Sequence, residues 1–235
     1  VLVDSFDAES LVYVNDLDIA SDGRIYFSDS SSRHSARALQ STLAASLLDI
    51  IEHAGNGRLF VYDPASQKTD VLMANLNFAN GVALAEDAQF VLVNETGSYR
   101  VHKYWLKGPK AGQSMVLVDN LPGFPDNLSR GLDGRFWLGL TSPRNALIDK
   151  FSEQVLLRKA IQRLPAFIRP QAVSYGHVLA ISAEGDVLHS LQDPSGNYPL
   201  TTGALEVESG LYVSSLTAAS LGFLRDPLAG PGPEE

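Results

Sequence analysis

The sequence predicts an all-β fold of the β-propeller type. The prediction depends on an internal repeat, on the hairpins inside it and on the strands between its copies. Three segments superimpose, and each opens with a short polar side chain and reaches a turn aspartate at the same interval. They begin at Asn15, Asn80 and Asp126, with turn residues at Asp22, Asp87 and Asp133. An apolar-alternating run before such a turn and a β-prone run after it indicate a β-hairpin.

Further β-prone runs fill the chain between these hairpins. They cover 58–62 and 69–73 after the first hairpin, 100–105 and 114–118 after the second, and 177–181 and 186–191 after the third. Four strands per unit, repeated every 45–65 residues or so, is typical of propeller blades (roughly 40–50 residues each) with insertions. A fourth unit covers Thr201 to Leu224, and we expect Leu2 to Ser5 to be the outer strand of an earlier blade.

Two insertions, His34 to His53 and Asn145 to Ile168, interrupt the blades with apolar residues at three- and four-residue steps. This period predicts helices. Both insertions leave from the end of a second strand, so we expect them on the same face of the propeller. They either cap exposed blade edges or cover a pocket, and the sequence favours neither.

The composition restricts the class of protein. A net charge of -9 and a sequence pI of about 5.0 argue against a nucleic-acid partner, which needs clustered Lys and Arg. The absence of cysteine excludes disulfides, thiolate chemistry and metal sites built on Cys. No run approaches the ~20 apolar residues of a membrane span, so we expect no membrane segment in this chain.

We expect residues 1–226 to form a single propeller domain and residues 227–235, rich in Pro and Gly and acidic at the end, to be a flexible tail. The compartment stays open between the cytoplasm and, if upstream residues carry a signal, the periplasm or the exterior. The partner we expect is a small-molecule substrate or ligand. The oligomeric state is not predicted.

The repeated polar position is the candidate site. The first strand of a blade lines the central channel, so Asn15, Asn80 and Asp126 should converge on it. Hard oxygen donors from three blades suit calcium, which takes about 6–8 oxygens, and Asp16 and Asn127 are neighbouring donors. The alternative is that these side chains cap turns through their own backbone, which Asn and Asp often do at strand starts. Their identical register favours a metal or substrate role.

Several segments together resemble the strictosidine-synthase-like family, whose members include bacterial proteins and the animal adipocyte plasma-membrane-associated protein. They are VNDLDIASDGRIYFSDSSS, GRLFVYDP, FANGVAL, YRVHKYWLKGPKAG, NLPGFPDNLSR and GRFWLGLTSPRNAL. The resemblance implies a six-bladed propeller, in the same superfamily as paraoxonases, gluconolactonase and regucalcin. This chain would then hold about four blades plus a strand. Either about two N-terminal blades lie upstream or the protein is a shortened natural variant, and we favour upstream blades because an open arc would expose two sheet edges.

The resemblance also implies site roles. In the related paraoxonases and gluconolactonases the matching Asn, Asn and Asp bind the catalytic metal, and a Glu from the first blade, which is not in this chain, completes the shell. We therefore expect calcium held by Asn15, Asn80 and Asp126. We expect catalytic roles for Asn127, as a further ligand, and for Asp16; either Asp16 or a residue in the missing blades would activate water.

Two functional hypotheses remain. The first is a calcium-dependent hydrolase of lactones or small esters, and the second is a propeller that binds a small molecule or partner without turnover. A third, the condensation that gives the family its name, is least favoured. Strictosidine synthase uses a Glu where this chain has Thr201 and Thr202, and Glu206 is out of register.

Other residues receive structural predictions. Trp137 and Tyr26 occupy second-strand apolar positions, so we expect both to be buried between blades. His102 and His189 are expected on the surface of outer-type strands, and His177 could face the channel.

Overall fold

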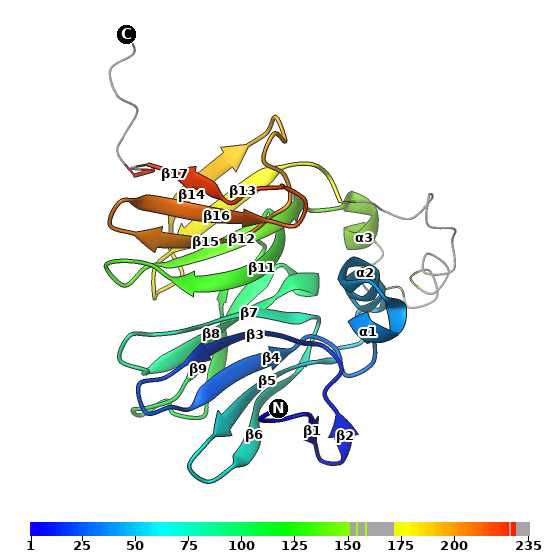
Figure 1. Ribbon diagram of the computed structural model, residues 1–235, viewed down its shortest axis with the longest axis vertical. Coiled ribbons are helices and arrows are strands. Elements are labelled where there is room, and N and C mark those ends of the chain that lie inside the picture. Colours follow the sequence, from blue (N-terminus) through cyan, green and yellow to red (C-terminus); the bar gives the residue numbers. More distant parts are fainter. Residues whose placement is uncertain (151–153, 155–157, 159–171, 226, 229–235) are drawn as a thin grey trace.

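The computed structural model describes residues 1–150, 154, 158, 172–225, 227 and 228, which form a series of twisted antiparallel sheets arranged as propeller blades (Figure 1). The first blade contains β3 (Val14–Ile19), β4 (Ile25–Asp29), β5 (Gly57–Asp63) and β6 (Lys68–Leu76). The second contains β7 (Ala79–Leu84), β8 (Phe90–Glu95), β9 (Arg100–Trp105) and β10 (Ser114–Val118). The predicted propeller architecture is confirmed.

The third blade contains β11 (Gly123–Arg130), β12 (Phe136–Pro143), β13 (Gly176–Ile181) and β14 (Val187–Asp193). The fourth contains β15 (Thr201–Val207), β16 (Gly210–Ser215) and β17 (Gly222–Leu224), so it has three strands among the described residues. Within every blade, consecutive strands pair antiparallel, and the two insertions separate β4 from β5 and β12 from β13 in sequence. The first strands of neighbouring blades, β3, β7, β11 and β15, pack beside one another.

The hairpin turns follow from the Asp-Gly sequences. Gly23 has φ +87 and Gly134 has φ +76, a left-handed conformation that glycine adopts without steric cost. Asp22 accepts a hydrogen bond from the backbone N–H of Arg24 at 3.1 Å, which closes the first turn. The turns therefore set the register in which the polar repeat positions begin each blade.

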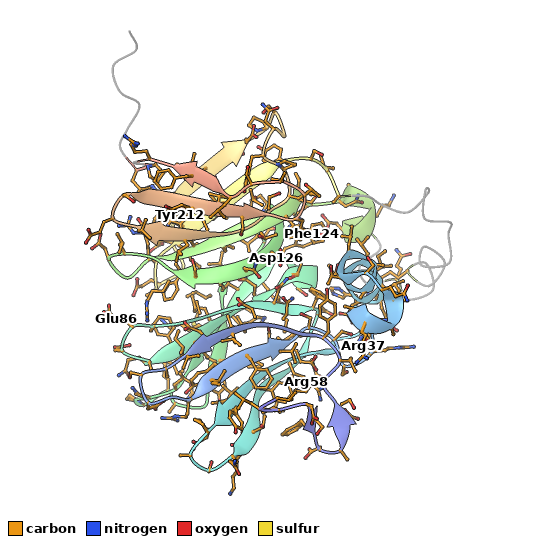
Figure 2. The ribbon with its side chains drawn as sticks, in the orientation of Figure 1. Arg37, Arg58, Glu86, Phe124, Asp126 and Tyr212 are labelled. Atoms are coloured by element: carbon orange, nitrogen blue, oxygen red, sulfur yellow. The ribbon has the colours of Figure 1, made fainter. Side chains whose placement is uncertain are left out.

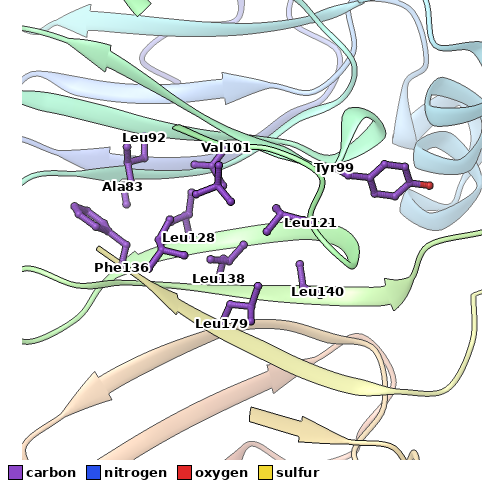
Figure 3. Close-up of a cluster of buried hydrophobic side chains, with 12 residues drawn as sticks. Ala83, Leu92, Tyr99, Val101, Leu121, Leu128, Phe136, Leu138, Leu140 and Leu179 are labelled. Carbon is purple, nitrogen blue, oxygen red and sulfur yellow. The ribbon is translucent and has the colours of Figure 1, made fainter. Parts of the chain in front are cut away.

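Apolar side chains pack between successive blades and form most of the core. Tyr26, 2% exposed, belongs to the cluster between the first and second blades, and Trp137, 0% exposed, belongs to that between the third and fourth. Both burial predictions are confirmed. Figure 3 shows the cluster between the second and third blades, with Leu128 and Leu138 near its centre.

The helices lie together on one side of the propeller (Figure 1). They are α1 (Ala36–Leu39), α2 (Thr42–Glu52) and α3 (Ala146–Lys150), and a short 3₁₀ helix, η1 (Thr96–Ser98), follows β8. Ser41 caps α2 by accepting a hydrogen bond from the backbone N–H of Ala44, and Gln40 before it has φ 52, which separates α1 from α2. The rest of the second predicted insertion, and most of the predicted tail, lie outside the described residues.

Two local predictions differ from the structure. Leu2 to Ser5 was expected to be a blade strand, but the short strand β1 (Ser5–Phe6) pairs with β2 (Glu9–Ser10) as a separate hairpin. His102 was expected at the surface, but it is 7% exposed because its ring nitrogen bonds the buried carboxylate of Glu95 at 2.5 Å. In the described part of the chain, no helix is long and apolar enough to cross a membrane.

Candidate metal and substrate site

A break in strand pairing occurs at the same place in each of the first three blades. The register shifts between Val14 and Leu17, between Ala79 and Val82, and between Pro125 and Leu128. Each break contains the repeated polar residue. Such irregularities turn a side chain away from the regular alternation of a strand and are frequent next to active sites. At each repeated position, therefore, the side chain is polar and also lies at a break in the strand pairing.

Hydroxyl groups after the second strands fix the orientation of the two asparagine amides. Nδ2 of Asn15 donates to Oγ of Ser30 at 2.9 Å, and that hydroxyl donates to the carbonyl of Ala79 in the next blade at 2.6 Å. Nδ2 of Asn80 likewise donates to Oγ1 of Thr96 at 3.2 Å. Because each hydroxyl uses its proton on a neighbouring blade, it can only accept from the amide, so each amide turns its carbonyl oxygen away from the hydroxyl.

Asn80 and Asp126 form the closest pair of the repeated residues. Nδ2 of Asn80 donates to Oδ1 of Asp126 at 2.6 Å, while Oδ1 of Asn80 is buried and has no hydrogen-bond partner among the described residues. Burial raises the pKa of the Asp126 carboxyl to about 7, the nearby charge of Asp16 adds to this rise, and the hydrogen bond from Asn80 opposes it. The pair therefore combines a carbonyl oxygen that has no hydrogen-bond partner with a carboxylate that has no nearby positive charge among the described residues.

The two residues expected to be catalytic lie in different settings. Asn127 lines the same cavity as the three repeated residues. Asp16 does not line it, and its carboxylate accepts from the backbone N–H of Val82 at 2.9 Å and of Leu17 at 2.9 Å. Asp16 thus joins β3 to β7. Burial raises the pKa of its carboxyl, and these backbone N–H groups oppose the rise.

Asn15, Asn80, Asp126 and Asn127 together line a cavity of about 450 Å³. Figure 2 labels Asp126 and Phe124 near the middle of the molecule, on β11. Most other lining side chains are apolar, and those of α2 place the first helical insertion over the cavity. The apolar lining residues include Leu43, Leu47, Ile50, Phe78, Phe124 and Val173. Of the two interpretations of this insertion, the structure favours the one in which it covers a pocket.

The cavity wall also includes one of the two threonines that the sequence comparison set against the glutamate of strictosidine synthase. Thr202 lines the cavity and its hydroxyl bonds that of Ser214 at 2.7 Å. Thr201 is buried, accepting from the backbone N–H of His177 and donating to its carbonyl, each at 2.8 Å. His177 lines a different, smaller cavity beside β17. Glu206 accepts from Nε1 of Trp137 at 2.9 Å, so it is occupied by a structural contact.

Sequence reasoning missed the hydroxyls of Ser30 and Thr96. Each follows the second strand of its blade, at nearly the same interval from the asparagine that it orients. It also missed Asn94, which is fully buried and donates from Nδ2 to the carbonyl of Asp126 at 2.6 Å. A polar residue recurring near the end of each second strand is the signal that could have found them.

Residues 15–109, which include two of the three repeated positions, match the family model described as strictosidine synthase. Over these residues the chain, a β-propeller, is similar to the strictosidine synthase family. Protein STRICTOSIDINE SYNTHASE-LIKE 3 of Arabidopsis thaliana is 35% identical over 217 residues, covering 89% of this chain and 54% of that protein. The adipocyte plasma membrane-associated protein of Bos taurus is 34% identical over 227 residues, covering 93% of this chain and 53% of that protein.

The chain therefore spans about half the length of the curated relatives it matches. Solved structures agree with the fold. A gluconolactonase from Xanthomonas campestris has a TM-score of 0.58 at 15% identity, over 91% of this chain and 57% of its own. Regucalcin from Agrobacterium tumefaciens, described as a calcium-binding protein, has a TM-score of 0.53 at 14% identity, over 88% of this chain and 55% of its own.

Proposed function

We propose that the complete protein is a calcium-dependent hydrolase of lactones or small esters, with the ion held by Asn15, Asn80, Asp126 and Asn127. The observation that carries the proposal is the unpartnered, buried Oδ1 of Asn80 beside the carboxylate of Asp126. A buried polar atom without a partner costs about 1–3 kcal/mol, which coordination to a cation would offset. The donors are all oxygens, as calcium requires.

The protein's own side chains would prepare this site before any ion binds. Ser30 and Thr96 hold the amides of Asn15 and Asn80 so that the carbonyl oxygens are the free atoms. Four side chains supply fewer oxygens than the 6–8 that calcium takes, which leaves positions for water, for substrate and for other parts of the complete protein. When bound, the ion would polarise the carbonyl of an ester and stabilise the developing oxyanion.

The cavity walls indicate the character of the substrate. Asp126 is the one carboxylate or basic group among its described lining residues, and it would be occupied by the ion. The remaining wall is dominated by apolar side chains such as Leu47, Phe78 and Phe124. An uncharged substrate with an apolar flank would bury well there, whereas a charged acyl group would lose hydration without finding a partner.

Asp16 would act as a positioning residue in this proposal, because backbone N–H groups use its oxygens. Its expected role in activating water would use a lone pair that these backbone N–H groups leave free. Asp16→Asn separates the two roles. The base role predicts loss of kcat in a protein that melts normally, and the positioning role predicts that stability and calcium binding fall together.

The test is a pair of thermal melts of the purified chain, with calcium and with chelator. A ligand of the native state raises the midpoint, by an amount that corresponds to about 2.7 kcal/mol when the ion is at 100 times its Kd. We expect Asp126→Asn to abolish the shift. Asp133→Asn, in an exposed hairpin turn, is the matched control and should keep it. Identical melts of wild type in both conditions, repeated on the complete protein, would refute the calcium site.

Activity is measured on the complete protein with a panel of lactones and aryl esters. We expect turnover that chelator removes and calcium restores, and no condensation of an amine with an aldehyde, since Thr202 supplies no carboxylate. The Thr202→Glu variant tests whether a carboxylate at this position allows the condensation of an amine with an aldehyde. A small molecule that raises the melting midpoint without turnover of any substrate would instead support the binding-protein hypothesis.

A further inference from the structure

A second polar cluster lies at the C-terminal end of α2 and contains His34, Asp49 and Glu52. Asp49 and Glu52 are one turn apart on α2, and His34 belongs to the segment that joins β4 to α1. One nitrogen or oxygen atom of each lies within 4.8 Å of the others. None of the three lines the cavity described above. The cluster is therefore separate from the calcium site.

Asp49 is the unusual member of this cluster. Its side chain is 0% exposed, and its Oδ1 accepts from Oγ of Ser31 at 2.6 Å and from Nδ2 of Asn56 at 2.9 Å. Its Oδ2 is buried and has no hydrogen-bond partner among the described residues. Native proteins leave few buried carboxylate oxygens unpartnered, so this atom indicates a missing ligand.

The charges around the cluster also favour a cation. Both carboxylates are in the last turn of α2, where the helix carbonyls add partial negative charge and where the helix has no basic residue. Glu52 has a countercharge, because Nη1 of Arg33 bonds its Oε1. Among the described residues, the hydrogen-bond donors to Asp49 are neutral groups of Ser31 and Asn56.

The loop that carries His34 is held in place for such a role. Oγ of Ser31, which donates to Asp49, accepts from the backbone N–H of His34 at 2.9 Å and of Arg33 at 3.2 Å. The same hydroxyl therefore orients the carboxylate and the segment that presents the imidazole. Nε2 of His34 then lies 2.7 Å from Oε2 of Glu52.

We propose that His34, Asp49 and Glu52 bind one divalent transition-metal ion of the zinc type, through Nε2 of His34 and one oxygen from each carboxylate. An imidazole with two carboxylates suits zinc, whereas calcium prefers an all-oxygen shell. Metal–ligand distances of about 2.0 Å in tetrahedral geometry place ligand atoms about 3.3 Å apart, so His34 and Glu52 need to separate by roughly half an ångström. The ion replaces the proton between them, and water fills the fourth position.

The ion would fasten the helix that covers the cavity. Asp49 and Glu52 come from α2, and His34 comes from the segment that leaves the first blade, so shared coordination joins the two. Leu43, Leu47 and Ile50 of the same helix line the cavity. Binding of zinc at this cluster would therefore stabilise the cavity cover without contacting the substrate.

The experiment titrates chelator-stripped, purified chain with zinc by calorimetry and with cobalt by visible absorption. We expect about one equivalent of saturable zinc, a tetrahedral cobalt spectrum and a higher melting midpoint with zinc. Changing a partner that only supports a metal ligand costs 10–100-fold in affinity, so His34→Gln and Asp49→Asn should each cost ~100-fold or more. Asp49→Asn keeps an Oδ1 that can accept from Ser31. If this variant does not fold, the test uses His34→Gln, because His34 is partly exposed.

Two matched variants make the result specific. His189→Gln removes a histidine on β14, and Asp126→Asn removes the carboxylate of the calcium site; both should bind zinc as wild type does. Retained zinc binding in Asp126→Asn also separates this site from the proposed function. The proposal is overturned if wild type shows no saturable zinc binding, or if His34→Gln binds zinc as tightly as wild type does. The cluster would then be an ion-pair network only.

Discussion

Replacement of Trp137 tests whether the packing between the third and fourth blades holds the structure together. Its side chain is 0% exposed, packs with Val178, Ala204 and Leu211, and stacks at 13° on the ring of His189. Trp137→Ala should lower the free energy of unfolding by roughly 3–5 kcal/mol, the usual cost of deleting a buried aromatic side chain. Neighbouring blades cannot collapse into the space without breaking other contacts, so we expect the upper half of this range.

Trp137→Phe separates the hydrogen bond from the packing. It removes the 2.9 Å bond from Nε1 to Glu206, but Glu206 still accepts from the backbone N–H of Leu132 at 2.9 Å and lies 3.3 Å from Nε of Arg135. The carboxylate keeps partners, so the expected loss is about 1–2 kcal/mol.

The assay is urea unfolding followed by circular dichroism, with midpoint and slope compared for each variant. Trp105→Ala is the control, because Trp105 is partly exposed and contacts Lys110 through its ring face at 4.8 Å. It should cost about 1 kcal/mol. A loss below about 1 kcal/mol for Trp137→Ala would refute the reasoning, because the side chain would then not be part of the interblade core.

Two further predictions concern the neighbourhood of the site. Gly81→Ala should destabilise the protein by roughly 1–3 kcal/mol and reduce the calcium-induced rise in melting temperature. Its Cβ would lie 2.3 Å from the backbone nitrogen of Leu128 and push β7 away from β11; a wild-type melting profile would contradict this. Burial would raise the pKa of Glu95, but hydrogen bonds from His102 and Arg100 outweigh it and hold the pKa well below 4.5. Its stabilising contribution is thus present above pH 4.5 and is lost as the pH falls below this value, so urea unfolding across that range should show a flatter pH dependence for Glu95→Gln.

Much of the fold could be predicted because its repeat is local. Asn15, Asn80 and Asp126 all lie on the first strands of their blades, as their equal intervals to the turn aspartates indicate. The helical insertion was visible from its period, but its division at Gln40 depends on a left-handed residue and a serine cap that periodicity does not report.

The finer parts of the site depend on contacts between blades, which join residues far apart in the sequence and cannot be read from one sequence alone. Contacts within a blade can be hidden too: His102 on β9 is buried and bonds Glu95 on β8, and an outer-strand pattern cannot reveal that a polar side chain has a buried partner. Asp16 has the position of a ligand in sequence, yet the backbone N–H of Val82, on the next blade, takes up its carboxylate. The calcium and zinc sites stay predictions until the titrations are done.

The hydroxyls of Ser30 and Thr96 have a mechanical consequence. Each bonds an amide of the site and, at the same time, the backbone of the following blade: Ser30 reaches Ala79 and Thr96 reaches Pro125, both at 2.6 Å. Sliding one blade against the next would therefore rotate an amide oxygen out of line. If the proposed ion binds there, its affinity should depend on the spacing between neighbouring blades, and a change that fixes this spacing should strengthen ion binding.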